Sequence, residues 1–189
     1  MIHKMGQGFV RDQYSGKLIT KSEDLERFKV SGFWTFLALD HAKKTKWYEE
    51  VHNLVVTLGL NKLLDDTLGT AAATASWFLG LTAASPSPAL ADTMSSHAGW
   101  TENVTYSDAA RQAWTENAAA SAGVITNSGA PAQFGINGST TVGGAFLTSN
   151  NTKSGTSGIL FSCAAFASGN RSLISGDTLF VTAQFTISN

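Results

Sequence analysis

The chain has 189 residues, which is enough for one hydrophobic core with an appendage. Its formal net charge is −1 and it contains one cysteine, Cys163. These values exclude a global electrostatic attraction for nucleic acid or an anionic membrane, an internal disulfide framework and a multi-cysteine zinc site.

Charge is distributed unevenly along the chain. Residues 1–66 hold ten of the thirteen Lys and Arg and nine of the fourteen Asp and Glu, so residues 67–189 hold only eight charges. Ser, Thr, Asn, Gly and Ala replace the charged residues of an ordinary soluble domain. Such a neutral surface suits a protein packed into an assembly or displayed in many copies, rather than a solitary enzyme.

Residues 1–26 combine turn residues and charges with no sustained period. We expect an extended arm that a neighbour orders, and two short strands around Gly16 are the alternative. The N-terminus lacks the apolar core of a signal peptide and no window approaches a membrane span, which predicts a protein made in the cytosol that does not use the secretory route. The predicted partner contacts are Phe9, Val10, Leu18, Ile19, Trp34 and Trp47.

Arg27 to Asp40 is predicted to be a strand. Its even-numbered positions from Phe28 to Ala38 place Trp34 and Phe36 on one face. Phe33, Leu37 and Leu39 lie on the other face, so we expect the second half of this strand to be covered on both sides.

Lys46 to Leu68 is the one segment with a convincing helical pattern, because its apolar residues recur at three- and four-residue steps. Gly59 lies inside this segment and costs about 1 kcal/mol relative to alanine, which predicts a kink or a break. Gly69 is placed to end the helix.

Strand and turn signals alternate through the rest of the chain. We expect strands at residues 74–81, 112–121, 123–127, 159–166 and 177–187, loops at 83–88 and 150–158, and a short helix at 90–97 with Trp100 beside it. Ala132, Phe134 and Ile136 alternate before Asn137-Gly138, which predicts a hairpin with Ser139 to Leu147.

The last segment, Asp177 to Ile187, is the clearest strand. Leu179, Val181, Ala183 and Phe185 fall on one face and polar residues on the other, with Ser175-Gly176-Asp177 as the turn before it. The sequence therefore predicts a mainly β fold, an antiparallel sandwich or jelly roll with one helix at about 46–68. We divide it into an arm with the first strand (1–45) and the helix with the sandwich (46–189).

Residues that could support catalysis are scattered. The histidines (His3, His41, His52 and His97) lack metal-ligand spacing, and Asp92 to His97 gives a Ser/His/Asp order whose side chains would mostly diverge on a helix. We interpret Asp92 as a helix cap and Cys163 as a buried thiol. Glu102, Asp108 and Glu116 are candidates for glycoside cleavage, but more simply serve as surface charges or caps. We predict no catalytic residue, metal or cofactor.

Four aromatic residues allow two interpretations. Trp77, Trp100, Trp114 and Tyr106 would form either a core between sheet and helix, which we favour, or a platform on which sugars stack.

Several segments between Trp47 and the C-terminus resemble small virion proteins of tailed bacteriophages. These segments are His52-Asn53-Leu54-Val55-Val56 with Gly59-Leu60-Asn61, Ser76 to Leu81, Ala91 to His97 with Gly99 to Glu102, and Arg171 to Leu179. The resemblance covers residues 47–189 and implies a structural role without an assigned activity.

Together with the neutral surface, the resemblance leads us to expect a head decoration or cement protein on the capsid exterior, assembled in the host cytoplasm. Its expected partners are the major capsid protein and sister copies, with no nucleic acid and no membrane. A tail or fibre component that contacts the host surface is the alternative, and a glycan-cleaving enzyme is a more distant one.

Overall fold

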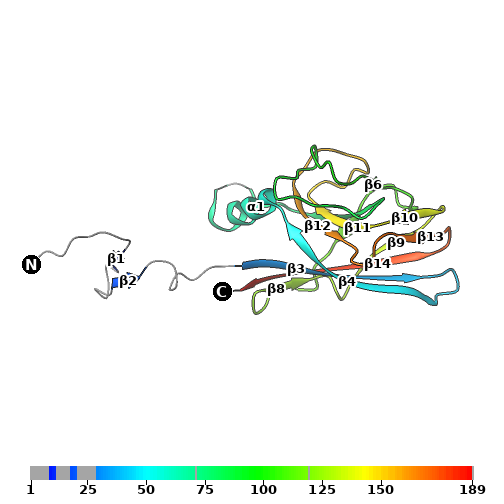
Figure 1. Ribbon diagram of the computed structural model, residues 1–189, viewed down its shortest axis with the longest axis horizontal. Helices are drawn as coiled ribbons and strands as arrows, with labels where there is room; N and C mark the ends of the chain where they lie inside the picture. Colours follow the sequence, from blue (N-terminus) through cyan, green and yellow to red (C-terminus); the bar gives the residue numbers. More distant parts are fainter. Residues whose placement is uncertain (1–8, 12–17, 21–28, 71, 119, 189) are drawn as a thin grey trace, which may run out of the picture.

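Antiparallel strands make up most of the structure, and the computed structural model describes residues 9–11, 18–20, 29–70, 72–118 and 120–188 (Figure 1). In chain order the elements are β1 (Phe9–Arg11), β2 (Leu18–Thr20), β3 (Lys29–Leu39), β4 (Thr45–Val55), α1 (Thr57–Leu68), β5 (Trp77–Thr82), β6 (Glu102–Asn103), β7 (Gln112–Trp114), β8 (Val124–Thr126), β9 (Ala132–Gly135), β10 (Thr140–Val142), β11 (Gly144–Thr148), β12 (Leu160–Ala165), β13 (Arg171–Leu173) and β14 (Thr178–Ser188). The predicted mainly β fold with one helix is confirmed.

The pair β3 and β14 is the longest in the sheet. The register runs without interruption from Thr178 opposite Leu39 to Ser188 opposite Lys29. Both alternations predicted for these strands are confirmed, because the core contains Trp34, Phe36 and Ala38 from β3 and Leu179, Val181, Ala183 and Phe185 from β14. On the opposite face, Phe33, Leu37 and Leu39 are only half-buried, so the predicted full cover of that face is wrong.

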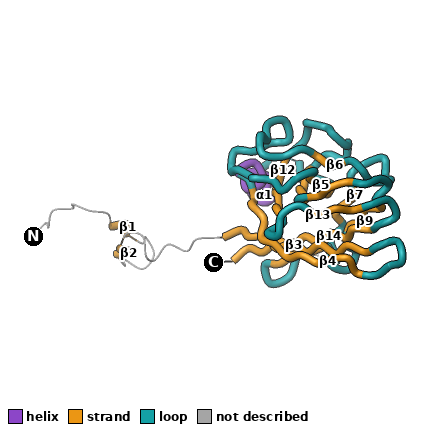
Figure 2. Tube along the Cα trace, turned by 45° about the vertical axis from the view of Figure 1, so that its right-hand side comes forward, coloured by secondary structure: helices purple, strands orange, loops and turns teal. Residues whose placement is uncertain are grey.

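Strand β4 connects two layers of the sheet. It pairs with β3 from Thr45 to Asn53, and its last residues, from Asn53 to Val55, pair with β12. One layer contains β4, β3 and β14 with β8 and β9, and the other contains β12, β11 and β5 with β6 and β7. Figures 1 and 2 show β4 crossing between these layers. Rings from both layers meet in the core. The ring centroids of Phe36 and Phe166, for example, lie 4.7 Å apart.

The predicted helix from Lys46 to Leu68 is wrong in its first half, since Thr45–Val55 is a strand. Glu49 and Val51 point to the same buried side of β4. A charged residue at position 49 interrupts the apolar alternation that identifies a strand, although Ser168 and Arg171 hold its carboxylate in place. The neighbouring apolar residues therefore matched a helical period instead.

Gly59 does not kink the helix but lets it approach the sheet. It lies in the first turn of α1, where an added Cβ would stand 2.4 Å from the carbonyl oxygen of Phe161 in β12. The predicted end at Gly69 is confirmed, because its N–H donates to the carbonyls of Asp65 and Leu64. With twelve residues α1 is too short to cross a bilayer, and the described part of the chain has no other helix that could.

Two local predictions are wrong, the first because the chain forms tight turns and the second because distant strands determine the pairing. Residues 90–97 form turns closed by a bridge between Thr93 and Ser96, not a helix. Asn137-Gly138 does not make a hairpin, since β9 pairs with β14 and β10 pairs with β13. The predicted strand from Ser139 to Leu147 is interrupted at Gly143, where the backbone of Ser85 approaches.

Near the N-terminus, β1 pairs antiparallel with β2, with Val10 opposite Ile19. The two-strand alternative around Gly16 is thus confirmed for the residues that are described, and the rest of the predicted arm lies outside them. The predicted division after residue 45 falls where β4 begins, and β4 pairs with β3 in the same sheet.

Substituting Phe185 with Asp tests the central strand. Phe185 is 6% exposed and its ring contacts Trp34, Trp114 and Phe161, so Phe185→Asp should lower the free energy of unfolding by several kcal/mol, about 3 or more. Phe180→Asp, on the opposite and half-exposed face of β14, is the matched control and should cost clearly less. Urea unfolding measures both, and equal losses would contradict the assigned faces.

Candidate functional site

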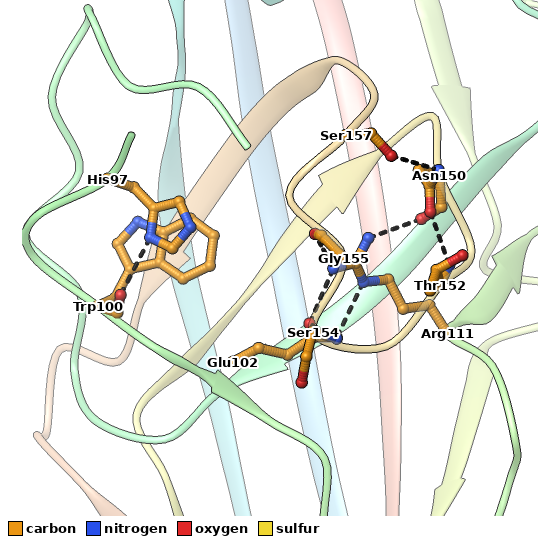
Figure 3. A network of polar contacts seen from close by, with 9 residues as sticks. All are labelled: His97, Trp100, Glu102, Arg111, Asn150, Thr152, Ser154, Gly155 and Ser157. Atoms are coloured by element: carbon orange, nitrogen blue, oxygen red, sulfur yellow. Dashed lines mark hydrogen bonds and ion pairs between the residues drawn. The ribbon is translucent and has the colours of Figure 1, made fainter. Parts of the chain in front are cut away.

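A buried ion pair organises the loops at the edge of the second layer (Figure 3). Arg111 Nε and Nη2 donate to the two carboxylate oxygens of Glu102 at 2.9 and 2.8 Å. Their side chains are 0% and 8% exposed. Bidentate pairs of this kind combine charge with fixed geometry, so they position the backbone that carries them.

The same two side chains hold the polar loop at residues 150–158. Arg111 donates to the carbonyls of Asn150 (2.8 Å) and Gly155 (2.9 Å), and Ser154 N donates to Glu102 Oε2 (2.7 Å). We call these five residues the loop latch. Sequence reasoning does not predict this latch, since the pattern around Glu102 indicates only a catalytic acid, a surface charge or a cap.

A shallow hollow of about 260 Å³ lies beside the loop latch, and His97 and Trp100 form part of its lining. Their rings are stacked with centroids 3.7 Å apart, and His97 Nδ1 lies 3.0 Å from the carbonyl oxygen of Trp100. In Figure 3 this stack lies to one side of the loop latch, and the latch residues Glu102, Arg111, Ser154 and Gly155 line the same hollow.

The Ser/His/Asp order at 92–97 does not form a triad. Asp92 accepts a hydrogen bond from Ala89 N at 3.0 Å instead of capping a helix, and His97 is engaged with Trp100. Thr93 and Ser95 share a hydroxyl contact at 3.1 Å. Each group therefore stabilises its own turn.

The other candidate catalytic residues are buried, paired within the fold or exposed. Cys163 is fully buried, and burial raises the pKa of its thiol well above the usual value. Glu102 is held in the loop latch, whereas Asp108 and Glu116 are exposed. Among the described residues, no three His, Cys, Asp or Glu side chains group as metal ligands. That the protein is not an enzyme stays a prediction.

Of the predicted partner contacts, the structure removes one. Trp34 is fully buried between Phe36 and Phe185, so its side chain is not on the surface. Trp47 is half-buried, with its ring 5.5 Å from Phe166 and the Arg171 guanidinium 5.7 Å from its ring centre. Contacts by Phe9 and Val10 in β1 and by Leu18 and Ile19 in β2 stay predictions.

Most charges of residues 67–189 are used inside the fold. Arg171 binds Glu49 at 3.0 Å, and Asp177, 1% exposed, binds Lys46 at 2.6 Å. Lys153 donates to the carbonyl of Tyr106 at 2.8 Å. With Glu102 and Arg111, these contacts engage five of the eight charges in this part of the chain.

The predicted aromatic group divides into two pairs. Trp100 and Tyr106 are buried, which agrees with the core interpretation. Trp77 in β5 and Trp114 in β7 are directly opposite each other and only half-buried. Both line two further hollows, one apolar of about 280 Å³ and one mixed of about 390 Å³.

Breaking the loop latch should destabilise the protein strongly. Arg111→Met leaves the Glu102 carboxylate buried without its partner, so we expect a loss of about 3–5 kcal/mol and faster proteolysis within residues 150–158. Adding Glu102→Gln to this variant should restore part of the loss. Glu116→Gln, at an exposed carboxylate, is the control and should change stability by about 0.5 kcal/mol or less. If Arg111→Met matched that control, the latch would have no structural role.

Glu49 predicts a stability difference that depends on pH. Burial alone would raise the pKa of its carboxyl, but the Ser168 N–H and the Arg171 guanidinium outweigh burial and lower that pKa below the ordinary 4.5. The stabilisation is therefore present above pH 4.5 and lost as the pH falls through the lower, folded-state value. The advantage of the native protein over Glu49→Gln in urea unfolding should shrink on acidification, and Glu50→Gln, on the exposed face of β4, is the control. An advantage that stays constant into strong acid would refute this role of Glu49.

Comparisons of the chain with protein-family models, with curated proteins and with solved structures found no match. The functional assignment therefore depends on the residues and geometry of this chain.

Proposed function

We propose that this chain is a virion structural protein of a tailed bacteriophage. In this proposal it is a head decoration or cement protein, assembled onto the capsid exterior in the host cytoplasm. It bridges neighbouring major capsid protein subunits and stabilises the shell against internal pressure. The resemblance expected for segments of residues 47–189 motivates this assignment, and the sparse charge of residues 67–189 supports it.

The observation that carries the proposal is the internal use of charge. Because Glu102, Arg111, Lys153, Arg171 and Asp177 are engaged within the fold, the part of the sandwich formed by residues 67–189 presents few unpaired charges outward. Covering unpaired charges with a neighbouring protein is costly, whereas covering such a neutral surface is not. The sandwich is thus suited to dense packing among other subunits.

The N-terminal residues supply the second element of the proposal. Residues 1–26 contain four Lys or Arg and four Asp or Glu, together with Phe9, Val10, Leu18 and Ile19. A segment of this composition gains most of its contacts by binding a neighbour, through many weak interactions. We propose that it attaches the sandwich to the major capsid protein or to a sister copy. Trp47, opposite Ala38 at the far end of β3 from Lys29, would make a separate contact, whereas Trp34 is buried.

Repetition on the particle makes modest contacts sufficient. When each copy touches two neighbouring capsid subunits, the second contact forms at the high effective concentration set by the first. Sister copies that touch each other would add to the same effect. A contact that is weak in isolation can therefore stabilise an entire shell.

One observation favours the alternative, a tail or fibre component that contacts the host surface. Trp77 and Trp114 lie side by side, half-exposed, next to a groove with hydroxyl groups. Half-exposed aromatic pairs of this type serve in recognition as well as in cores. Cleavage of a host glycan has less support, because Arg111 and Ser154 occupy the Glu102 carboxylate.

Deleting residues 1–26 tests the attachment. The deletion removes equal numbers of positive and negative residues, so any effect is not due to net charge. We expect the truncated protein to keep its circular dichroism spectrum and cooperative unfolding but to lose binding to particles stripped of the native protein. Binding by the full chain should also weaken with added salt, since exposed charges are screened over about 8 Å at physiological ionic strength.

Two results would contradict the proposal. Equal binding of the truncated and full chains would show that the sandwich, not the N-terminal segment, attaches the protein. Antibody labelling confined to tails in negative-stain micrographs would assign the protein to the alternative location.

A further inference from the structure

An apolar hollow opens at the end of the sandwich where β3 begins and β14 ends. It measures about 280 Å³, and its lining includes Val30, Leu63 of α1, Ile187 and four aromatic residues (Trp77, Trp114, Phe161 and Phe185). The rings pack edge to face, with Trp77 5.3 Å from Phe161 and Phe161 5.1 Å from Phe185. Protein interiors are normally close-packed. An apolar group that fills this hollow would therefore gain packing contacts with the side chains that line it.

The second hollow continues from the same two tryptophans. It measures about 390 Å³ and shares Trp77, Trp114 and Ile125 with the first, but its lining adds the hydroxyls of Thr74, Ser76 and Thr115 and the carboxylate of Glu116. Ser76, Thr115 and Glu116 are exposed. Within the described residues, no internal hydrogen bond engages the side chains of these three. They are free to bind a polar group.

Among the described residues that line the two hollows, the other carboxylate is Asp66, and it is already paired. Asp66 lines the apolar hollow, but it forms an ion pair with Lys62 and accepts a hydrogen bond from Thr74 N. Of the described lining residues, those of the apolar hollow therefore offer rings and aliphatic groups, and those of the adjoining groove offer hydroxyls and the Glu116 carboxylate.

We propose that the two hollows form one binding site for an amphiphile with a single alkyl chain and a neutral, hydroxylated head group. The alkyl chain lies among Phe161, Phe185 and Leu63. The head group lies against Trp77 and Trp114, where the C–H face of a sugar ring stacks on indole and its hydroxyls bind Thr115 and Glu116. An anionic head group is disfavoured by the Glu116 carboxylate. This inference does not depend on capsid decoration.

Titration calorimetry of the full chain with three soluble probes tests this site. The probes are n-octyl β-D-glucoside below its micelle-forming concentration, methyl β-D-glucoside, which has the head group alone, and octyl sulfate, which has an anionic head. We expect octyl glucoside to bind at least about tenfold more tightly than methyl glucoside, since burial of two methylenes already gives that factor. It should also bind more tightly than octyl sulfate.

A variant that fills the apolar hollow makes the test specific. Ala120 lines that hollow from an exposed position, so Ala120→Trp should occlude it without removing a core side chain, and octyl glucoside binding should fall about tenfold or more. Ala130→Trp, at an exposed position that lines neither hollow, is the matched control and should bind as the native chain does.

Three results would overturn the proposal. These are equal affinities for the octyl and methyl glucosides, unchanged binding by Ala120→Trp, and tighter binding of octyl sulfate than of octyl glucoside. The proposal would also be overturned if the protein self-associated and bound octyl glucoside only after dilution. A second copy of the chain would then occupy the hollow.

Discussion

The ladder between β3 and β14 is the constraint on which the rest of the structure depends. It joins the first long strand of the sandwich to the last, from Leu39 opposite Thr178 to Lys29 opposite Ser188. Nearly the whole chain must therefore be present before the central pair can form, and such long-range pairing makes folding slow. The ladder also brings Val30 and Ile187 together, and these residues line the apolar hollow. The end of the sandwich where β3 begins is thus also the end where we propose a binding site.

Buried polar groups fasten the other elements to this ladder. Asp177 at the start of β14 binds Lys46 of β4, and Glu49 of the same strand binds Arg171 of β13. The side chain of Asn127 spans the interval between β8 and β9, accepting from Ala183 N at 2.8 Å and donating to the Val181 carbonyl at 3.2 Å. It therefore satisfies backbone groups of β14 that no strand reaches. These contacts pair charged and amide groups within the fold that would otherwise face solvent.

Sequence patterns identified the elements whose environment is simple. Strand β14 and the inner face of β3 alternate cleanly because one side of each is buried. The strand at Thr45–Val55 has a helix-like sequence pattern because Glu49, buried and paired with Arg171, hides its alternation. Asn137-Gly138 has the local chemistry of a hairpin, but pairing of β9 with β14 overrides it. The loop latch could not be read from sequence, since Glu102, Arg111 and Ser154 meet only after the layers have formed.

We propose that neighbours in a repeated array cover the charge-poor part of the sandwich, residues 67–189. The most direct test of this claim is the copy number of the chain in purified particles, measured by quantitative mass spectrometry against the major capsid protein. Decoration of the shell predicts a number comparable with that of the major capsid protein. A number that is a very small fraction of it, as for a tail-tip component, would contradict the claim.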